Sequence, residues 1–221
     1  LDTSKQIIPF AAKESCQAMI AAGLNTDLDS CLRFREFLLQ NTPRSAVFDQ
    51  IVLHFGVRSN SPEQKVIPAH EVVRAGVDAF YNRTVKEDLK WEPQIKQMVQ
   101  DLGSIYKLYL VTSGHPETQE QKITKLEAAP LFRQIFFVDS SKHETKQAAF
   151  QKILMESQIP AEACLSVGNR VDTDLGEAKV LGFKTCWVRY GEYANLLPQK
   201  IEEQPDYTIE DLSDLRRVCL L

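Results

Sequence analysis

Acidic side chains follow a short apolar run in LSVGNRVDTDLGEAKVLG, residues 165–182. Gly168 allows a sharp exit from the run, and Asn169, Asp172 and Asp174 come before apolar residues resume at helical spacing. These side chains are therefore expected on a loop between a strand and a helix, where parallel sheets bind ligands. Their oxygens suit a hard cation such as Mg2+. The alternative is that Asp172 and Asp174 only cap the following helix and match its dipole.

Hydroxyl groups follow a second apolar run, YKLYLV at residues 106–111. Thr112 and Ser113, with Gly114, present hydroxyls and backbone N–H groups that could hold an anion at a helix start. The alternative for Thr112 is an ordinary N-cap. His115 comes next and could touch a substrate, or could be a partly exposed residue at the helix start.

Lysines follow a third run, QIFFV at residues 134–138. Asp139, Ser140 and Ser141 precede Lys142, and Lys146 lies one helical turn further on. Either lysine could be an ordinary solvated charge. Because the carboxyl ends of parallel strands share one edge of a sheet, the three polar stretches are expected to meet in one crevice.

Two kinds of segment must position these residues. Before about residue 82 the pattern is helical, with helices predicted at 4–22, 27–40, 43–55 and 62–82 and no strand-period pattern. After Trp91, helices and apolar strands alternate, which implies right-handed crossovers and a mostly parallel sheet. The predicted strands are 106–111, 134–138, 164–167, 185–189 and 207–209, and the predicted helices are 93–102 (stopped by Gly103), 115–127, 144–157, 174–181 and 212–218.

Composition excludes several classes of protein. The 221 residues carry a net charge of -4, which gives no basic footprint for nucleic acid. No apolar stretch approaches the ~18 residues that span a bilayer, and the start lacks the order of a signal peptide, so a cytoplasmic protein is expected. The five cysteines are scattered without CxxC spacing, so neither a disulfide framework nor a zinc site is indicated.

Taken in order, three stretches resemble motifs of the haloacid dehalogenase superfamily of hydrolases. LVTSG is similar to the second motif, SKHETKQAAF to the third, and VGNRVDTDLGEAKVLGFKTCWV to the fourth. The resemblance runs from about Trp91 to the C-terminus. It implies an α/β fold with a three-layer, Rossmann-like, mostly parallel sheet over residues 89–221, and an all-helical cap domain over residues 1–88.

The resemblance implies a phosphatase that acts on a small phosphorylated metabolite through an aspartyl-phosphate. In that scheme Thr112 hydrogen-bonds a phosphoryl oxygen and Lys146, rather than Lys142, offsets its charge. Ser113, Gly114 and His115 are implied to bind substrate. The implied ligands of Mg2+ are Asn169, Asp172 and Asp174.

The first departure from the family is its nucleophile motif, DxDxT, which this sequence lacks. LDTS at residues 1–4 resembles what usually follows that motif, so we expect that preceding residues are missing from this sequence and that the chain as written is inactive. The family's first strand is central in its sheet. Its absence would leave a gap with exposed strand edges and apolar surface.

The second departure is Asn169, where metal-dependent members usually carry aspartate. An amide oxygen brings no charge, so weaker Mg2+ binding is expected. Asn169 followed by Asp172 also resembles the 2-haloacid dehalogenases, which remain an alternative. A further alternative is a catalytically dead relative that binds a phosphorylated ligand or a protein partner.

Overall fold

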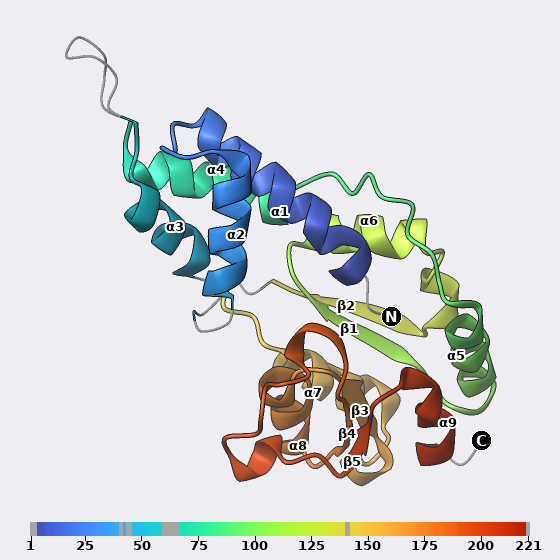
Figure 1. Cartoon of the computed structure of the whole chain (residues 1–221). Coiled ribbons are helices and arrows are strands. Elements are labelled where there is room, and N and C mark those ends of the chain that lie inside the picture. Colours follow the sequence, from blue (N-terminus) through green and yellow to red (C-terminus); the bar gives the residue numbers. More distant parts are fainter. Residues whose placement is uncertain (1–3, 40–41, 43–45, 59–66, 140–141, 220–221) are drawn as a thin grey trace. The chain divides into compact units, whose positions relative to one another are not determined.

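The computed structural model describes residues 4–39, 42, 46–58, 67–139 and 142–219 (Figure 1). The chain divides into two compact units, one of residues Lys5–Glu87 and one that runs from Asp88 onward. Each unit has its own buried hydrophobic cluster. No helix in the described ranges is both long and apolar enough to cross a membrane.

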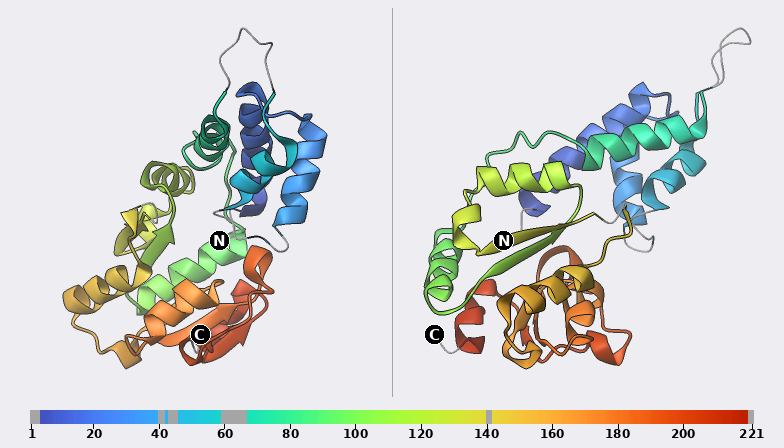
Figure 2. Two further views of the ribbon diagram at one scale, coloured as in Figure 1. Left: turned by 90° about the vertical axis from the view of Figure 1, so that its left-hand side faces the viewer. Right: turned by 180° about the vertical axis from the view of Figure 1, so that it is seen from behind.

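The first unit is helical, as predicted (Figures 1 and 2). Its helices are α1 (Ser4–Ala21), α2 (Leu28–Leu38), α3 (Val47–Phe55) and α4 (Ala69–Tyr81). The predicted N-cap Asp27 accepts a hydrogen bond from the Ser30 amide at 2.9 Å. Helix α4 begins at Ala69, after Pro68, and the predicted earlier start at Pro62 lies outside the described residues, as does the start at Pro43. The role of this unit as a cap stays a prediction.

Close helix packing and a buried ion-pair network hold the first unit together. Gly76 of α4 lies so close to Met19 and Phe48 that a β-carbon at this position would overlap both. Arg83 is 6% exposed, and its guanidinium donates to Glu14 at 2.7 Å and to Glu87 at 2.7 and 2.9 Å. Burial of the arginine is therefore compensated by two carboxylates.

The second unit alternates strands and helices, as predicted. Its strands are β1 (Tyr109–Ser113), β2 (Gln134–Val138), β3 (Leu165–Gly168), β4 (Lys184–Val188) and β5 (Tyr207–Ile209). Its α-helices are α5 (Pro93–Ile105), α6 (Pro116–Lys125), α7 (Lys146–Ser157), α8 (Glu177–Lys179) and α9 (Leu215–Val218). A π-helical turn, η5 (Val171–Gly176), leads into α8, and short 3-10 turns are η2 (Ala129–Leu131), η4 (Ala161–Ala163), η6 (Gly191–Tyr193), η7 (Ile201–Glu203) and η8 (Leu212–Asp214).

The strands form two separate parallel sheets. One has the order β1-β2 and the other β3-β4-β5, and every pairing is parallel. The α/β class with a parallel sheet is thus confirmed. Within the described residues, β1 pairs only with β2 and β3 only with β4, so each sheet has an edge strand that carries part of the candidate site.

Some predicted boundaries were wrong. Helix α5 runs through Gly103 to Ile105, because an isolated glycine weakens a helix without ending it. Strand β1 begins at Tyr109 instead of Tyr106 and includes Thr112 and Ser113. The helix predicted from Asp174 starts earlier, in the π-helical turn η5.

Candidate active-site crevice

Lys146 lies at the start of α7 and joins two strand ends. Its Nζ atom is 2.5 Å from Asp174 Oδ1 and 3.5 Å from the carbonyl oxygen of Val111 in β1. The side chains of Lys146 and Asp174 are 13% and 11% exposed, so this ion pair is well shielded from water. The start of α7 is fixed by Glu177, whose carboxylate accepts a hydrogen bond from the Gln147 amide at 2.6 Å.

Asp174 is the residue around which the acidic loop is folded. Its Oδ2 atom accepts hydrogen bonds from the amides of Asn169 and Arg170 at 3.1 and 3.0 Å, and its carbonyl accepts one from Ser166 at 2.7 Å. Gly168 lies so close that a β-carbon there would overlap the carboxylate. Asp174 thus binds amides that precede it, so the alternative that it only caps the following helix is wrong.

Asp172 forms an ion pair with a different cation, Arg170. Arg170 donates to both carboxylate oxygens, with a distance of 3.0 Å to Oδ1, and the Thr173 amide donates to Oδ1 at 3.0 Å. Burial alone would raise the pKa of Asp172, but the hydrogen bond and charge of Arg170 outweigh it and lower that pKa. Arg170 also lies over the ring of Tyr193 at 5.1 Å. The sequence motif gave no signal for this arginine.

Thr112 is the next-to-last residue of β1 and lies beside a tight turn that helix α6 supports. Its hydroxyl donates to Gln119 Oε1 at 3.2 Å. Gly114 has a φ of +138°, its amide donates to the Val138 carbonyl at 3.1 Å, and a β-carbon here would overlap the Gln119 amide. Because Thr112 is in the strand and His115 is the N-cap residue of α6, the N-cap alternative for Thr112 is wrong.

The other predicted residues are placed less centrally. Ser113 is exposed, and the Nδ1 atom of His115 is buried without a hydrogen-bond partner in the described structure. Lys142 is 69% exposed in its side chain and lies 3.5 Å from Asp139, which favours Lys146 as the lysine of the crevice. Ser140 and Ser141 lie outside the described residues.

The predicted Mg2+ ligands have suitable donors in an unsuitable arrangement. Their oxygens are hard ligands, as Mg2+ prefers. However, Arg170 holds Asp172 and Lys146 holds Asp174. Among the described residues, no three histidine, cysteine, aspartate or glutamate side chains converge on one point. In this arrangement both carboxylates of the loop are paired with cations of the chain itself.

Comparison with known proteins decides the family. The sequence profile of haloacid dehalogenase-like hydrolases matches residues 24–188, which is most of the chain. The chain belongs to this family. The sequence motifs predicted this family, and the matched residues include all three of them: LVTSG, SKHETKQAAF and VGNRVDTDLGEAKVLG.

Relatives of this haloacid dehalogenase-like hydrolase include phosphatases. The glyceraldehyde 3-phosphate phosphatase of Pyrococcus furiosus is 29% identical over 99% of this chain and 88% of its own length. Two crystal structures share the fold. That of a predicted phosphoglycolate phosphatase from Haemophilus somnus has a TM-score of 0.66 at 18% identity, covering 96% of this chain and 91% of its own. That of the HAD-hydrolase YfnB from Bacillus subtilis, bound to magnesium, has a TM-score of 0.63 at 16% identity and covers 97% and 93%.

Proposed function

We propose that this crevice removes the phosphoryl group from a small phosphorylated metabolite. The observation that carries the proposal is the position of the Lys146 ammonium, which binds the β1 backbone at Val111 and the Asp174 carboxylate beyond β3. An ammonium group bound to the backbone at Val111, the residue before Thr112, suits an anionic group such as a phosphoryl group.

Each side chain has a role in this scheme. Thr112 donates its hydroxyl hydrogen to a phosphoryl oxygen when substrate replaces Gln119 as the acceptor of this hydrogen bond. Lys146 offsets the negative charge that spreads over the phosphoryl oxygens during transfer. Asp174 orients Lys146, and the amides of Asn169 and Arg170 fix Asp174 in turn. Ser113, Gly114 and His115 remain proposed contacts of the substrate.

The nucleophile of the proposed aspartyl-phosphate route is not among these side chains. Asp174 is held by Lys146 and by two amides, so it is a poor candidate for attack on phosphorus. The expectation that the chain as written is inactive stays a prediction, and binding of phosphate is the part of the proposal that these side chains support.

Mg2+ dependence is a separate part of the proposal. It is supported by the oxygen donors of Asn169, Asp172 and Asp174 on one loop and by the magnesium bound to the similar fold of YfnB. Because the two carboxylates are paired with Lys146 and Arg170, Mg2+ would have to displace a cation. Weak binding of Mg2+ is therefore expected.

The substrate class is proposed from the relatives. Phosphatases named for glyceraldehyde 3-phosphate match almost the whole chain at 29% and 24% identity. A short phosphorylated aldehyde is therefore the first substrate to test.

Calorimetric titration of the protein with inorganic phosphate, the reaction product, tests this function. The unmodified chain is expected to bind phosphate, and Lys146→Met should weaken binding by about tenfold or more because a charge-assisted contact is lost. Lys152→Met, on the same helix and 60% exposed in its side chain, is the matched control. Phosphate binding that is absent, or equal in all three proteins, contradicts the proposal, as would release of chloride from 2-chloropropionate.

A further inference from the structure

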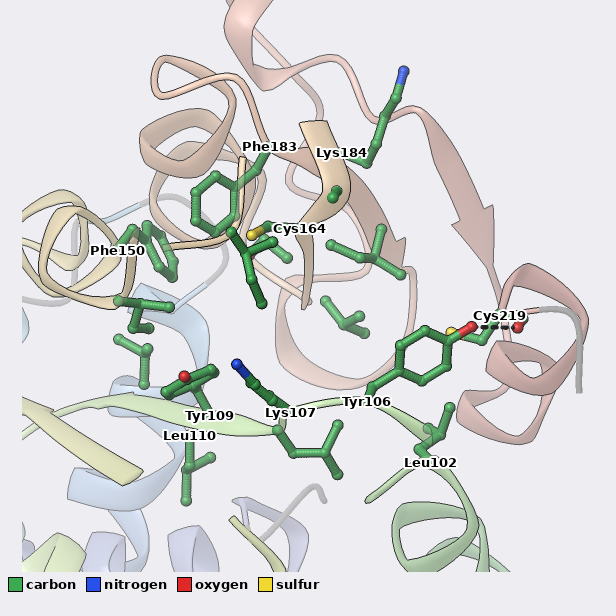
Figure 3. Close-up of a pocket in the computed structure, with 18 of the residues that line it drawn as sticks. Leu102, Tyr106, Lys107, Tyr109, Leu110, Phe150, Cys164, Phe183, Lys184 and Cys219 are labelled. Carbon is green, nitrogen blue, oxygen red and sulfur yellow. Dashed lines mark hydrogen bonds between the residues drawn. The ribbon is translucent and has the colours of Figure 1, made fainter. Parts of the chain in front are cut away.

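A groove of about 560 Å³ in the second unit reaches the candidate crevice, because Lys146 and Asp174 are among the residues that line it (Figure 3). Figure 3 shows Phe150 and Phe183 on one side of the groove and Leu110 of β1 on the other. Apolar walls offer no hydrogen-bond donors to the three terminal oxygens of a phosphoryl group. We therefore expect further donors for those oxygens beside the groove, at the turn that follows β1.

Gln119 of α6 lies against this turn with its side-chain amide. Its Oε1 atom accepts the hydroxyl hydrogen of Thr112 at 3.2 Å. A β-carbon added at Gly114 would overlap Gln119 Nε2, so the amide nitrogen packs on the backbone of the turn. Helix α6 fixes the backbone of Gln119, whose N–H group donates to the His115 carbonyl at 3.0 Å. One side chain thus contacts both the hydroxyl and the glycine that the crevice offers to an anion.

The amide nitrogen of Gln119 carries two hydrogens that no acceptor among the described residues takes up. The hydrogen bond from Thr112 uses only the amide oxygen, and the backbone N–H group of Gly114 donates to the Val138 carbonyl at 3.1 Å. Gln119 is partly buried, and buried polar groups in proteins nearly always have a hydrogen-bond partner. These two donors are therefore available to a ligand at the turn.

The hydroxyl of Thr112 has a single hydrogen, which determines what must change when an anion binds. In the free protein that hydrogen points to Gln119 Oε1. When a phosphoryl oxygen accepts it, the side-chain oxygens of Thr112 and Gln119 face each other with no hydrogen between them. A half-turn of the amide about its last torsion, which is roughly twofold, brings Nε2 to the place of Oε1. One N–H group then meets the Thr112 oxygen, and the other is free for the phosphoryl group.

We propose that Gln119 is a further substrate-binding residue, whose side-chain amide turns over and donates a hydrogen bond to the phosphoryl group that Thr112 binds. The proposal rests on the proposed phosphatase function, because it adds a donor for the same phosphoryl group. Lys146 offsets charge from the start of α7, whereas Gln119 supplies an uncharged, directed donor from α6. A carboxylate of the same size cannot replace this amide, because it has no hydrogen to donate and repels an anion.

Calorimetric titration with inorganic phosphate tests this role. Gln119→Met keeps the shape of the side chain without its donors, and we expect phosphate to bind about tenfold more weakly because a hydrogen bond to a charged group is lost. Gln119→Glu should weaken binding by about 30-fold or more near pH 6.5, because the ionised carboxylate also repels phosphate. The matched control is Thr124→Glu, which adds the same charge at an exposed position of α6 and should change binding by less than about twofold.

Acid should reverse the effect of Gln119→Glu. A glutamate side chain ordinarily titrates near pH ~4.3, and its protonated form can donate a hydrogen bond again. We therefore expect the dissociation constants of Gln119→Glu and of the unmodified protein to approach each other, to within about threefold, as pH falls from about 6.5 to about 4. Taking their ratio at each pH removes the titration of phosphate itself. A loss that came only from altered structure would not recover with acid.

Thr112→Val separates a direct contact from one that acts through the Thr112 hydroxyl. If Gln119 itself donates to phosphate, Gln119→Met should weaken binding by a similar factor in the Thr112→Val protein. Loss of the effect in that protein overturns the direct contact. A spectroscopic test uses 15N-labelled protein, in which the side-chain amide signals of Gln119 are identified by their absence in Gln119→Met. Added phosphate should move one of these signals downfield, and unmoved signals also overturn the proposal.

Failure of this proposal differs from failure of the proposed function. Absence of phosphate binding in the unmodified protein contradicts the phosphatase function, and the role of Gln119 with it. Phosphate binding that is weakened in Lys146→Met but unchanged in Gln119→Met and Gln119→Glu overturns the role of Gln119 alone.

Discussion

At the scale of single residues, the crevice depends on one shielded ion pair. Lys146 and Asp174 come from positions 28 apart in sequence, and their side chains are nearly buried. Removing one partner of such a pair leaves the other charge without compensation, which costs more than the pair contributes when intact. The two residues therefore affect stability and function together.

Replacing Lys146 by methionine should affect both properties. We expect binding of inorganic phosphate, measured by calorimetric titration, to weaken by about tenfold or more because a charge-assisted contact is lost. The free energy of unfolding should fall by about 3 kcal/mol, since Asp174 is left without its cation. Urea titration followed by circular dichroism measures the second effect.

A double variant distinguishes the two effects. Lys146→Met with Asp174→Asn removes the stranded charge, so the free energy of unfolding should partly recover while phosphate binding does not. Lys152→Met is the control because its partner Glu156 is 3.9 Å away and both are exposed, and it should change stability by less than about 1 kcal/mol. Recovery of phosphate binding in the double variant would contradict the assignment of Lys146.

Gly168→Ala tests how tightly Asp174 is positioned. The added β-carbon would overlap the Asp174 carboxylate, so the carboxylate must move away from the Asn169 and Arg170 amides. We expect a loss of about 1–3 kcal/mol in the free energy of unfolding, typical of overpacking. The added group would also meet the β-carbon of Asp174, so only Asp174→Gly relieves the overlap in full. Gly168→Ala should therefore cost less in an Asp174→Gly protein, and an equal loss there would contradict this explanation.

At this scale the sequence predicted which residues belong to the candidate site better than it predicted their hydrogen-bond partners. Spacing after apolar runs predicted that Thr112, Lys146 and Asp174 follow the ends of strands. The structure places Thr112 in β1, Lys146 at the start of α7 after β2, and Asp174 in η5 after β3. Spacing could not reveal that Arg170 holds Asp172, or that Gln119 supports Thr112. Those contacts depend on side-chain directions in three dimensions, which spacing along the chain does not specify.

At the scale of elements, the turn between β1 and α6 determines where the Thr112 hydroxyl lies. Gly114 has a φ of +138°, which side chains other than glycine rarely adopt, and it packs against Gln119. The fold requires glycine at position 114 but not at position 103, which lies in the same unit. A β-carbon added at Gly103, inside α5, would lie 3.6 Å from its nearest neighbour, an ordinary contact, and Gly103 lies in regular helix.

Alanine substitutions at these glycines should have opposite effects. Gly114→Ala should reduce the free energy of unfolding by about 1–3 kcal/mol, through backbone strain and contact with Gln119. Gly103→Ala should stabilise the protein by up to about 1 kcal/mol, because alanine favours helix. Thermal unfolding of both variants measures the difference. Equal effects would mean that the turn has no special backbone requirement.

Element boundaries were less predictable than element order. Alternating apolar runs and helical spacing correctly gave every strand of the second unit, because burial of parallel strands dictates continuous apolar residues. The π-helical turn before α8 could not be predicted, because it results from Asp174 binding back to the Asn169 and Arg170 amides. Local propensity contains no information about that contact.

At the scale of the whole molecule, paired carboxylates connect stability to pH in both units. In the first unit the hydrogen bond from Arg83 lowers the pKa of Glu14, and it outweighs burial in lowering that of Glu87. In the second unit Thr185 and Lys179 outweigh burial in lowering the pKa of Asp206. A carboxyl with a lowered folded pKa stabilises the fold above its unfolded pKa, and this contribution is lost as pH falls through the folded value.

Acid should therefore weaken the whole molecule below pH 4.5, the ordinary value for glutamate. Between that pH and the folded pKa of Glu87, the unfolded chain binds more protons, so the free energy of unfolding falls as pH falls. Glu87→Gln removes one such group, and its plot of unfolding free energy against pH should have a shallower slope below pH 4.5. Urea titrations from pH 3 to 7 measure the slope, with the exposed Glu156→Gln as control. An unchanged slope in Glu87→Gln would show that Arg83 does not couple this carboxylate to folding.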